Sequence, residues 1–135
     1  MISRWAIALT LAAVSCGQVS SQALAAPRNA SLIKMFDTDN DGTLDLAEVK
    51  KAASTLFTRL DRDHDGTLNK GELAGRLSAE ELAAADPDHD GTLTADEYIA
   101  VVQQRFNAAN PDKDRTLDAR ELNAREGRAL LRLLR

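Results

Sequence analysis

Apolar residues along the chain flank four polar stretches at fixed distances. One apolar residue directly follows the end of each stretch, and another lies four residues before its start. The first set is Val49, Leu73, Tyr98 and Leu122, and the second is Ile33, Phe57, Leu82 and Phe106. Residues three or four apart share one face of a helix. The pattern therefore predicts helices on both sides of every polar stretch, with these side chains in a common core.

The connectors between the polar stretches are short. Residues 49–60 and 98–109 contain neither Gly nor Pro, so each is predicted to form one continuous helix. At about 1.5 Å per residue, such a helix holds its flanking stretches about 20 Å apart. The middle connector contains Gly75, and its Ser78 and Glu81 have the spacing of a capping box. It is predicted to break at 75–77 and to start a new helix at Ala79.

These connectors predict an all-α fold. The first and second stretches cannot meet along one rigid helix, nor can the third and fourth. The break in the middle connector allows the second and third to meet, and two antiparallel helices then return the fourth to the first. We therefore expect four polar loops joined by short shared helices, in a compact helical bundle with the loops, numbered in chain order, paired 2/3 and 1/4.

The two ends of this bundle have their own patterns. Residues 31–36 are predicted to form a short helix before the first stretch. After the fourth stretch, residues 122–126 continue the last helix, and Gly127 is expected to interrupt it. Residues 128–135 are amphipathic, and their leucines are expected to dock on the core. The alternative for their arginines is contact with a membrane or a partner.

The first 25 residues have the features of an export signal. Residues 1–4 are short and basic, residues 5–14 are apolar, and residues 23–25 read Ala-Leu-Ala, a small-x-small cleavage pattern. We predict cleavage after Ala25, a periplasmic location, and a mature domain of residues 26–135 without Cys16, the single cysteine. The alternatives are a retained membrane anchor and a lipid anchor at Cys16.

The polar stretches carry most of the acidic charge. Loop 1 is residues 37–48, loop 2 is 61–72, loop 3 is 86–97 and loop 4 is 110–121, and together they hold 18 of the 21 acidic residues. Oxygen-bearing residues recur at loop positions 1, 3, 5, 7, 9 and 12, which is the spacing of an EF-hand loop around a hard cation. Glycine occupies position 6 of the first three loops, where a sharp turn needs a left-handed backbone. So much clustered carboxylate charge predicts a poorly ordered chain without counterions.

The spacing predicts a set of metal ligands from each loop. They are Asp37, Asp39, Asp41, Thr43, Asp45 and Glu48 in loop 1; Asp61, Asp63, Asp65, Thr67, Asn69 and Glu72 in loop 2; Asp86, Asp88, Asp90, Thr92, Thr94 and Glu97 in loop 3; and Asn110, Asp112, Asp114, Thr116, Asp118 and Glu121 in loop 4. Loop 4 is predicted to be weak, because Asn110 removes a charge and Arg115 replaces the turn glycine. His64 and His89 stand at the fourth position and are expected to be solvated and not to bind the metal.

Oxygen ligands restrict the choice of metal. They disfavour zinc and copper, and magnesium rarely occupies cages made wholly of protein. Calcium and the trivalent lanthanides remain. Loop 1 offers five carboxylates, and because Coulomb energy scales with ionic charge, such a loop favours a trivalent ion.

Residues 86–135 resemble the lanmodulin family of periplasmic lanthanide-binding proteins from methylotrophic bacteria. The resemblance lies in DPDHDGTLTADEY, RFNAANPDKDRTLDAREL and the ALLRLLR end, with the short connectors and the export signal. Pro87 and Pro111 match the family's usual proline at the second loop position, whereas Thr38 and Arg62 depart from it. At the ninth position Asp45 and Asp118 match, while Asn69 and Thr94 do not.

The resemblance implies tight capture of lanthanide(III) ions (lanthanum, cerium, praseodymium, neodymium), weaker calcium binding and folding on metal binding. It also implies a role in lanthanide uptake or supply, with an uptake component or an alcohol dehydrogenase as partner. The metal-bound form is either a monomer or a metal-dependent homodimer. We expect no nucleic-acid partner and no membrane contact after cleavage. The main alternative is a periplasmic calcium sensor or buffer. A dockerin-like adhesive module and an enzyme are disfavoured, the latter because no catalytic group lies outside the loops.

Overall fold

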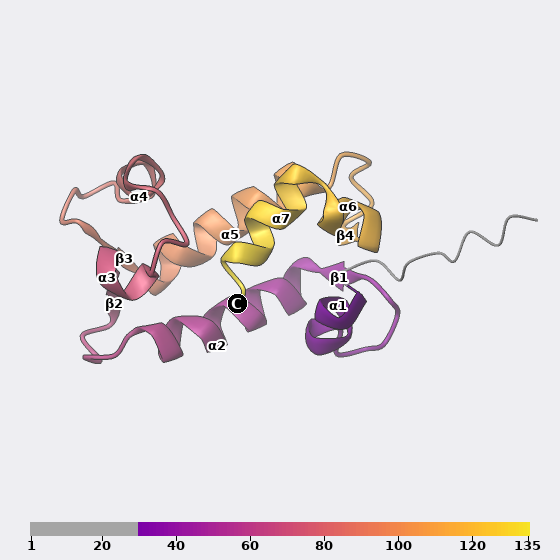
Figure 1. Ribbon diagram of the computed structural model, residues 1–135, viewed down its shortest axis with the longest axis horizontal. Helices are drawn as coiled ribbons and strands as arrows, with labels where there is room; N and C mark the ends of the chain where they lie inside the picture. The colour runs from indigo at the N-terminus through magenta and orange to yellow at the C-terminus, as the bar shows by residue number, and fades with distance from the viewer. Residues whose placement is uncertain (1–29) are drawn as a thin grey trace, which may run out of the picture.

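The computed structural model describes residues 30–135, so the predicted signal at residues 1–25 lies outside the described part of the chain. The described elements are mostly helical (Figure 1). In chain order they are α1 (Ala30–Phe36), β1 (Leu44–Asp45), α2 (Leu46–Leu60), β2 (Thr67–Asn69), α3 (Lys70–Leu73), α4 (Ala79–Ala85), β3 (Thr92–Thr94), α5 (Ala95–Ala109), β4 (Thr116–Leu117), α6 (Ala119–Asn123) and α7 (Arg125–Arg132). Among these residues, no helix is both long enough and apolar enough to cross a bilayer.

Two uninterrupted 15-residue helices, α2 and α5, form the frame of the molecule. Each runs from the end of one acidic loop to the start of the next, as the unbroken connectors predicted. Each begins with a capping box, in which Asp45 or Thr94 accepts a hydrogen bond from the N–H of the glutamate three residues later. Helix α5 packs against α2 on one side and against α7 on another (Figure 1).

The middle connector breaks where the sequence predicted. Helix α3 ends at Leu73, its C-cap Ala74 has a left-handed φ of 47°, and Gly75 follows with φ 75°. Ser78 then caps α4 by accepting a hydrogen bond from the Glu81 N–H. Two successive left-handed residues reverse the chain, and the predicted start of a new helix at Ala79 is confirmed.

Two short antiparallel ladders join the acidic loops at opposite ends of the long helices (Figure 1). Strand β1 pairs with β4 and places Leu44 opposite Leu117. Strand β2 pairs with β3 and places Leu68 opposite Leu93. All four leucines occupy the eighth position of their loops and are fully buried. The ladders therefore connect the loops to the hydrophobic core directly.

The core lies between α2, α5 and the C-terminal segment. Tyr98 on α5 is fully buried, and its ring centroid lies 5.9 Å from that of Phe57 on α2. The Tyr98 hydroxyl donates a 2.6 Å hydrogen bond to the Leu133 carbonyl. Leu130, Leu131, Leu133 and Leu134 are buried as well. The C-terminal leucines thus dock on the core, as their amphipathic spacing predicted.

The predicted interruption at Gly127 is wrong. The last helix breaks at Ala124, whose backbone is extended, and Gly127 lies inside α7. A Cβ atom on Gly127 would lie 2.1 Å from the Glu121 carbonyl oxygen and 2.5 Å from the Leu122 Cα atom. Glycine is present here because α7 passes against the backbone of α6, and not because it ends a helix.

Candidate metal centres

Each acidic loop makes the same sharp turn. The fourth residue has a left-handed φ of 59–60° in all four loops, and the sixth has a φ of 80–88°. In loops 1–3 the sixth residue is glycine, and its N–H donates a hydrogen bond to the carboxylate at the first position. These bonds join Gly42 to Asp37, Gly66 to Asp61 and Gly91 to Asp86, at 3.0, 3.2 and 2.8 Å. The turn therefore fixes the first carboxylate of each of these loops.

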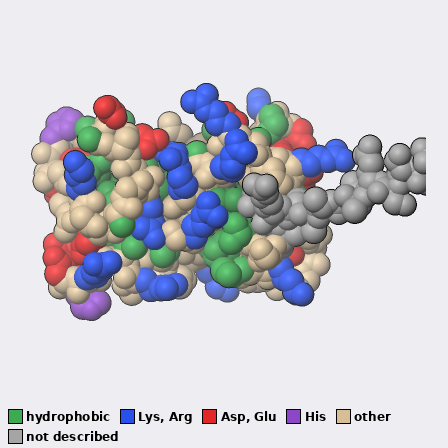
Figure 2. Space-filling model, viewed as in Figure 1, with side chains coloured by type: hydrophobic (Ala, Val, Ile, Leu, Met, Phe, Trp, Pro, Cys, Tyr) green, Lys and Arg blue, Asp and Glu red, His purple; other side chains and the backbone are tan. Residues whose placement is uncertain are grey.

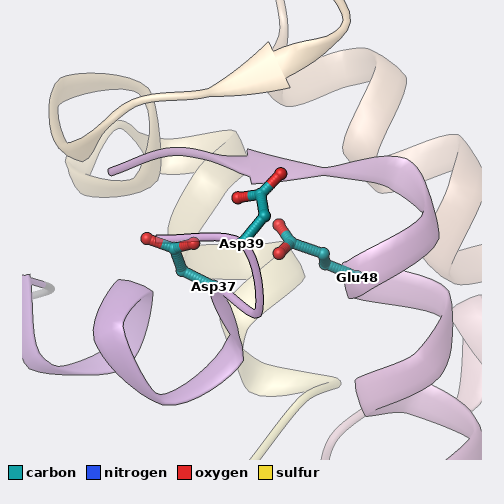
Figure 3. Close-up of side chains that lie close together, drawn as sticks. All are labelled: Asp37, Asp39 and Glu48. Carbon is teal, nitrogen blue, oxygen red and sulfur yellow. The ribbon is translucent and has the colours of Figure 1, made fainter. Parts of the chain in front are cut away.

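Three loops bring carboxylate oxygens together within 4.8 Å of one another. The clusters are Asp37, Asp39 and Glu48 in loop 1; Asp61, Asp63 and Glu72 in loop 2; and Asp86, Asp88 and Asp90 in loop 3. Figure 3 shows how the loop and the first turn of α2 bring the loop 1 side chains toward a common space. Because like charges this close repel, such clusters favour a bound cation.

The fifth and seventh positions of each loop form a pair that sequence reasoning missed. The threonine hydroxyl donates a hydrogen bond of 2.7–3.0 Å to the aspartate two residues earlier in all four loops. In loop 1 the hydroxyl and the N–H of Thr43 hold the pKa of Asp41 below its ordinary value. The repeated Asp-x-Thr spacing was the available signal. The threonine side chain orients the fifth-position aspartate, in addition to the metal-ligand role that the spacing predicted for the residue.

The ninth and twelfth positions form a capping box in every loop. Asp45, Asn69, Thr94 and Asp118 each accept a hydrogen bond from the N–H of the glutamate three residues later, and that glutamate accepts one from their own N–H. The predicted ninth-position ligands therefore lie at the helix N-termini. Asp45 lies outside the loop 1 carboxylate cluster, which is Asp37, Asp39 and Glu48. The structure gives the ninth-position residues the role of orienting the twelfth-position glutamate.

The second position divides the loops into two classes. In loops 1 and 2, the N–H groups of Thr38 and Arg62 donate hydrogen bonds of 2.6 and 2.9 Å to Glu48 and Glu72. Backbone hydrogen bonds from Arg62 and Asn69 hold the pKa of Glu72 below its ordinary value. Loops 3 and 4 have proline at this position and no N–H to donate. Their twelfth-position glutamates lack this restraint.

Several loop oxygens are buried without a hydrogen-bond donor. They are Oδ1 of Asp61, Asp86 and Asn110 and Oε1 of Glu121, among the described residues. Asp61 and Asp86 are 8% and 3% exposed, and their other oxygen is already held by the turn glycine. A buried carboxylate oxygen without a partner is costly, so it calls for a proton or a cation. The buried, unpartnered carboxylate oxygens of loops 2 and 3 therefore fit a hard cation.

Loop 4 differs from the other three. Arg115 has a φ of 80°, a conformation that strains any residue with a Cβ atom. Burial raises the pKa of Glu121, and the charges of nearby loop carboxylates raise it further. No carboxylate cluster forms here among the described residues, although the side-chain oxygen of Asn110 is buried and lacks a donor.

The two loop histidines are exposed. His64 and His89 both have a φ of 59° at the fourth position, and neither joins a ligand cluster in the described part of the chain. Sequence reasoning did not predict the left-handed backbone at this position. Asn, Asp and His adopt that conformation more readily than most residues, which was the available signal.

Comparison with protein-family models matched residues 32–103 to the EF-hand domain pair. The match covers just over half of the chain and includes loops 1–3 but not loop 4. A search of curated proteins found no match. The family match and the three acidic clusters together indicate a metal-binding protein.

Proposed function

Because the chain belongs to the EF-hand family, we propose that it is a high-affinity lanthanide(III)-binding protein that folds on metal binding. The observation that carries the proposal is the set of three carboxylate clusters, two of them with a buried first-position oxygen that lacks a donor. A bound cation would neutralise these clusters. Without the cation, these carboxylates repel one another. With the cation bound, they coordinate it, and the free energy of metal binding stabilises the folded chain.

The proposed arrangement has four EF-hand loops, paired 2/3 and 1/4. The β2–β3 and β1–β4 ladders support these pairs. Loops 1–3 would hold metal through the ligands named above, and loop 4 would bind weakly and serve as the structural partner of loop 1. The strained Arg115 and the neutral Asn110 support the weaker metal binding proposed for loop 4.

A trivalent ion is proposed on grounds of charge. Loop 1 has five carboxylates and loop 3 also has five, counting Asp96. A third positive charge on the cation increases its attraction to every one of them. The runner-up is a periplasmic calcium sensor or buffer. It is favoured by Asn69 and Thr94, which leave the ninth position of loops 2 and 3 without charge.

The proposed setting is the periplasm, reached by cleavage after Ala25. We propose a role in the uptake or supply of lanthanides, with an uptake component or a lanthanide-dependent alcohol dehydrogenase as partner, and no enzymatic activity. The described residues 30–135 supply the loops and the core of this binding domain.

A competition titration tests the choice of cation. Lanthanum is added to the chain in millimolar calcium, and helicity is followed by circular dichroism. We expect a further gain in helix at micromolar lanthanum, with calcium released from the protein. A chain that responds to calcium and shows no further response to lanthanum is a calcium sensor or buffer, and the lanthanide proposal is then wrong.

A further inference from the structure

A groove of about 640 Å³ runs along α2, from the end of loop 1 to the start of loop 2. Its floor includes Ala52, Leu56 and Leu60, which follow one another at four-residue spacing. This stripe is about 12 Å long. The volume lies within the range of small-molecule sites in proteins, which are also mainly apolar with a few polar groups.

One end of the groove is apolar. Helix α1 covers the first turns of α2 there (Figure 1), and it contributes Leu32, Met35 and Phe36 to the lining. Met35 is 70% exposed, and in the described part of the chain it is the large hydrophobic side chain that is exposed to solvent and not buried. Glu48 of loop 1 and Lys51 also line the groove near this end, so their opposite charges offset each other there.

The other end of the groove is cationic. Arg59 in the last turn of α2, Arg62, Arg76 and Arg135 all line it. Arg76 donates from Nε to the Arg135 carbonyl oxygen at 2.9 Å, which holds the C-terminal segment beside the groove. Figure 2 shows Lys and Arg side chains beside an apolar patch near the middle of the displayed face. Among residues 30–135 the ion pair that forms is Arg105–Glu81, outside the groove, so the side chains of Arg59, Arg62 and Arg135 have no carboxylate partner.

We propose that this groove binds a free long-chain carboxylate, with its tail toward α1 and its carboxylate on the arginines. Two features support this occupant. Four arginines gather at one end of the groove, whereas Lys51 is the cation that lines it near α1. The concentration of positive charge at one end matches a molecule with one charged end. Guanidinium groups also bind carboxylates through paired hydrogen bonds, and Arg59, Arg62 and Arg135 have donors free of any carboxylate.

This binding function goes beyond metal capture, although the groove touches loop 1 through Thr38 and Glu48. An acidic helix of a partner protein would need its charges spread along the groove, and the arginines are gathered at one end. An anionic membrane would need an open cationic surface, whereas the lining here is largely apolar. Both occupants are therefore less suited to the groove than a free carboxylate.

The test is methyl NMR of the metal-loaded chain with labelled methionine. Met35 and Met1 are the two methionines, and Met35→Leu identifies the groove signal. Dodecanoate below its micellar concentration should shift the Met35 signal and saturate it. The affinity for hexanoate should be lower by a factor of about ten or more, because hexanoate buries fewer methylenes. Dodecyltrimethylammonium, with the same tail and the opposite charge, should not saturate the signal.

Matched variants test the two ends of the groove. Arg59→Gln with Arg135→Gln should weaken dodecanoate binding about tenfold or more. Arg125→Gln with Arg128→Gln removes the same charge from exposed positions of α7 outside the groove and should leave the affinity unchanged. Ala52→Trp fills the floor and should abolish binding, with metal-loaded circular dichroism as the check on folding.

Four results would overturn the proposal. The first is a Met35 signal that dodecanoate does not move. The second is equal binding of the cationic detergent. The third is an unchanged affinity in the Arg59→Gln/Arg135→Gln variant. The fourth is binding only to anionic vesicles, or only to a helical Leu/Glu peptide, without binding of free dodecanoate.

Discussion

The residue at the second loop position decides how the twelfth-position glutamate is held. Thr38 and Arg62 supply an N–H to Glu48 and Glu72, while Pro87 and Pro111 cannot. The difference follows from covalent structure and needs no assumption about the metal. It means that a backbone N–H restrains the final carboxylate of loops 1 and 2 in the folded chain, and that loops 3 and 4 hold theirs less firmly.

Replacing Arg62 with proline tests this hydrogen bond. The folded-state pKa of Glu72 is lowered, so its contribution to stability is present above the unfolded pKa and is lost as pH falls through the folded pKa. Arg62→Pro should reduce stability at pH 7, and the reduction should disappear in acid. Chemical unfolding of the calcium-loaded chain at neutral and acidic pH measures it. Arg62→Ala keeps the N–H and loses the guanidinium, so an equal and equally pH-dependent loss in that variant would contradict the account.

Replacing Arg115 with glycine should strengthen loop 4. The left-handed backbone at Arg115 costs about 1–2 kcal/mol for a residue with a Cβ atom. Glycine's greater freedom in the disordered loop offsets about 0.5–1 kcal/mol of that gain. A net gain of about 1 kcal/mol is a factor of about five in metal affinity, measurable by calorimetric titration with lanthanum. Arg115→Gln removes the charge and keeps the strain, so a glutamine variant that binds as tightly as the glycine variant would assign the effect to charge alone.

At the level of elements, the connectors were the most informative part of the sequence. Residues without a helix breaker form α2 and α5, and Gly75 with the Ser78 capping box marks the reversal. These features are local, so the sequence shows them directly. The interruption at Gly127 was misplaced because glycine was interpreted as a breaker. The extended backbone of Ala124 has no local signal, and the close approach of α7 to α6 is a tertiary feature.

The close approach at Gly127 predicts a large effect for a small change. In Gly127→Ala the added Cβ atom would meet the backbone of Glu121 and Leu122, so α7 must move away from α6. Overpacking of this kind costs about 1–3 kcal/mol, which thermal unfolding of the metal-loaded chain should detect. Gly71→Ala is the control, because its Cβ atom would lie 3.1 Å from the Asn69 side-chain oxygen, where a shift of a few tenths of an ångström is enough, and not 2.1 Å from backbone as at Gly127. The interpretation fails if the two variants have the same unfolding temperature.

At the scale of the whole molecule, the C-terminal segment ties the two ends of the fold to the long helices. Tyr98 directly follows Glu97 of loop 3, and its hydroxyl reaches the Leu133 carbonyl. The sequence placed Tyr98 in the core by its spacing but could not identify this partner, which lies 35 residues away. Likewise, the spacing located the acidic loops. The threonine–aspartate bonds and the left-handed fourth position had weaker signals, namely the Asp-x-Thr repeat and the Asn or His at the fourth position of loops 1–3.

The Tyr98 hydroxyl predicts a loss of stability at high pH. Burial raises its pKa to about 12, so its contribution is present below the ordinary value of 10.0 and is lost as pH rises toward 12. Tyr98→Phe should cost about 1 kcal/mol at pH 8, and the variant should lose less stability than the parent between pH 10 and 12. Unfolding of the calcium-loaded chain across this range measures both effects. A parent and a variant with parallel pH profiles would contradict the burial of this hydroxyl.

The central claim is that a hard, highly charged cation in the acidic loops makes the chain fold. The most direct measurement is the far-ultraviolet circular dichroism of the purified chain, first in chelator and then after micromolar lanthanum is added. We predict little helix in chelator and a large gain on addition of the metal. A chain that is fully helical in chelator, and that micromolar lanthanum leaves unchanged, would contradict the claim.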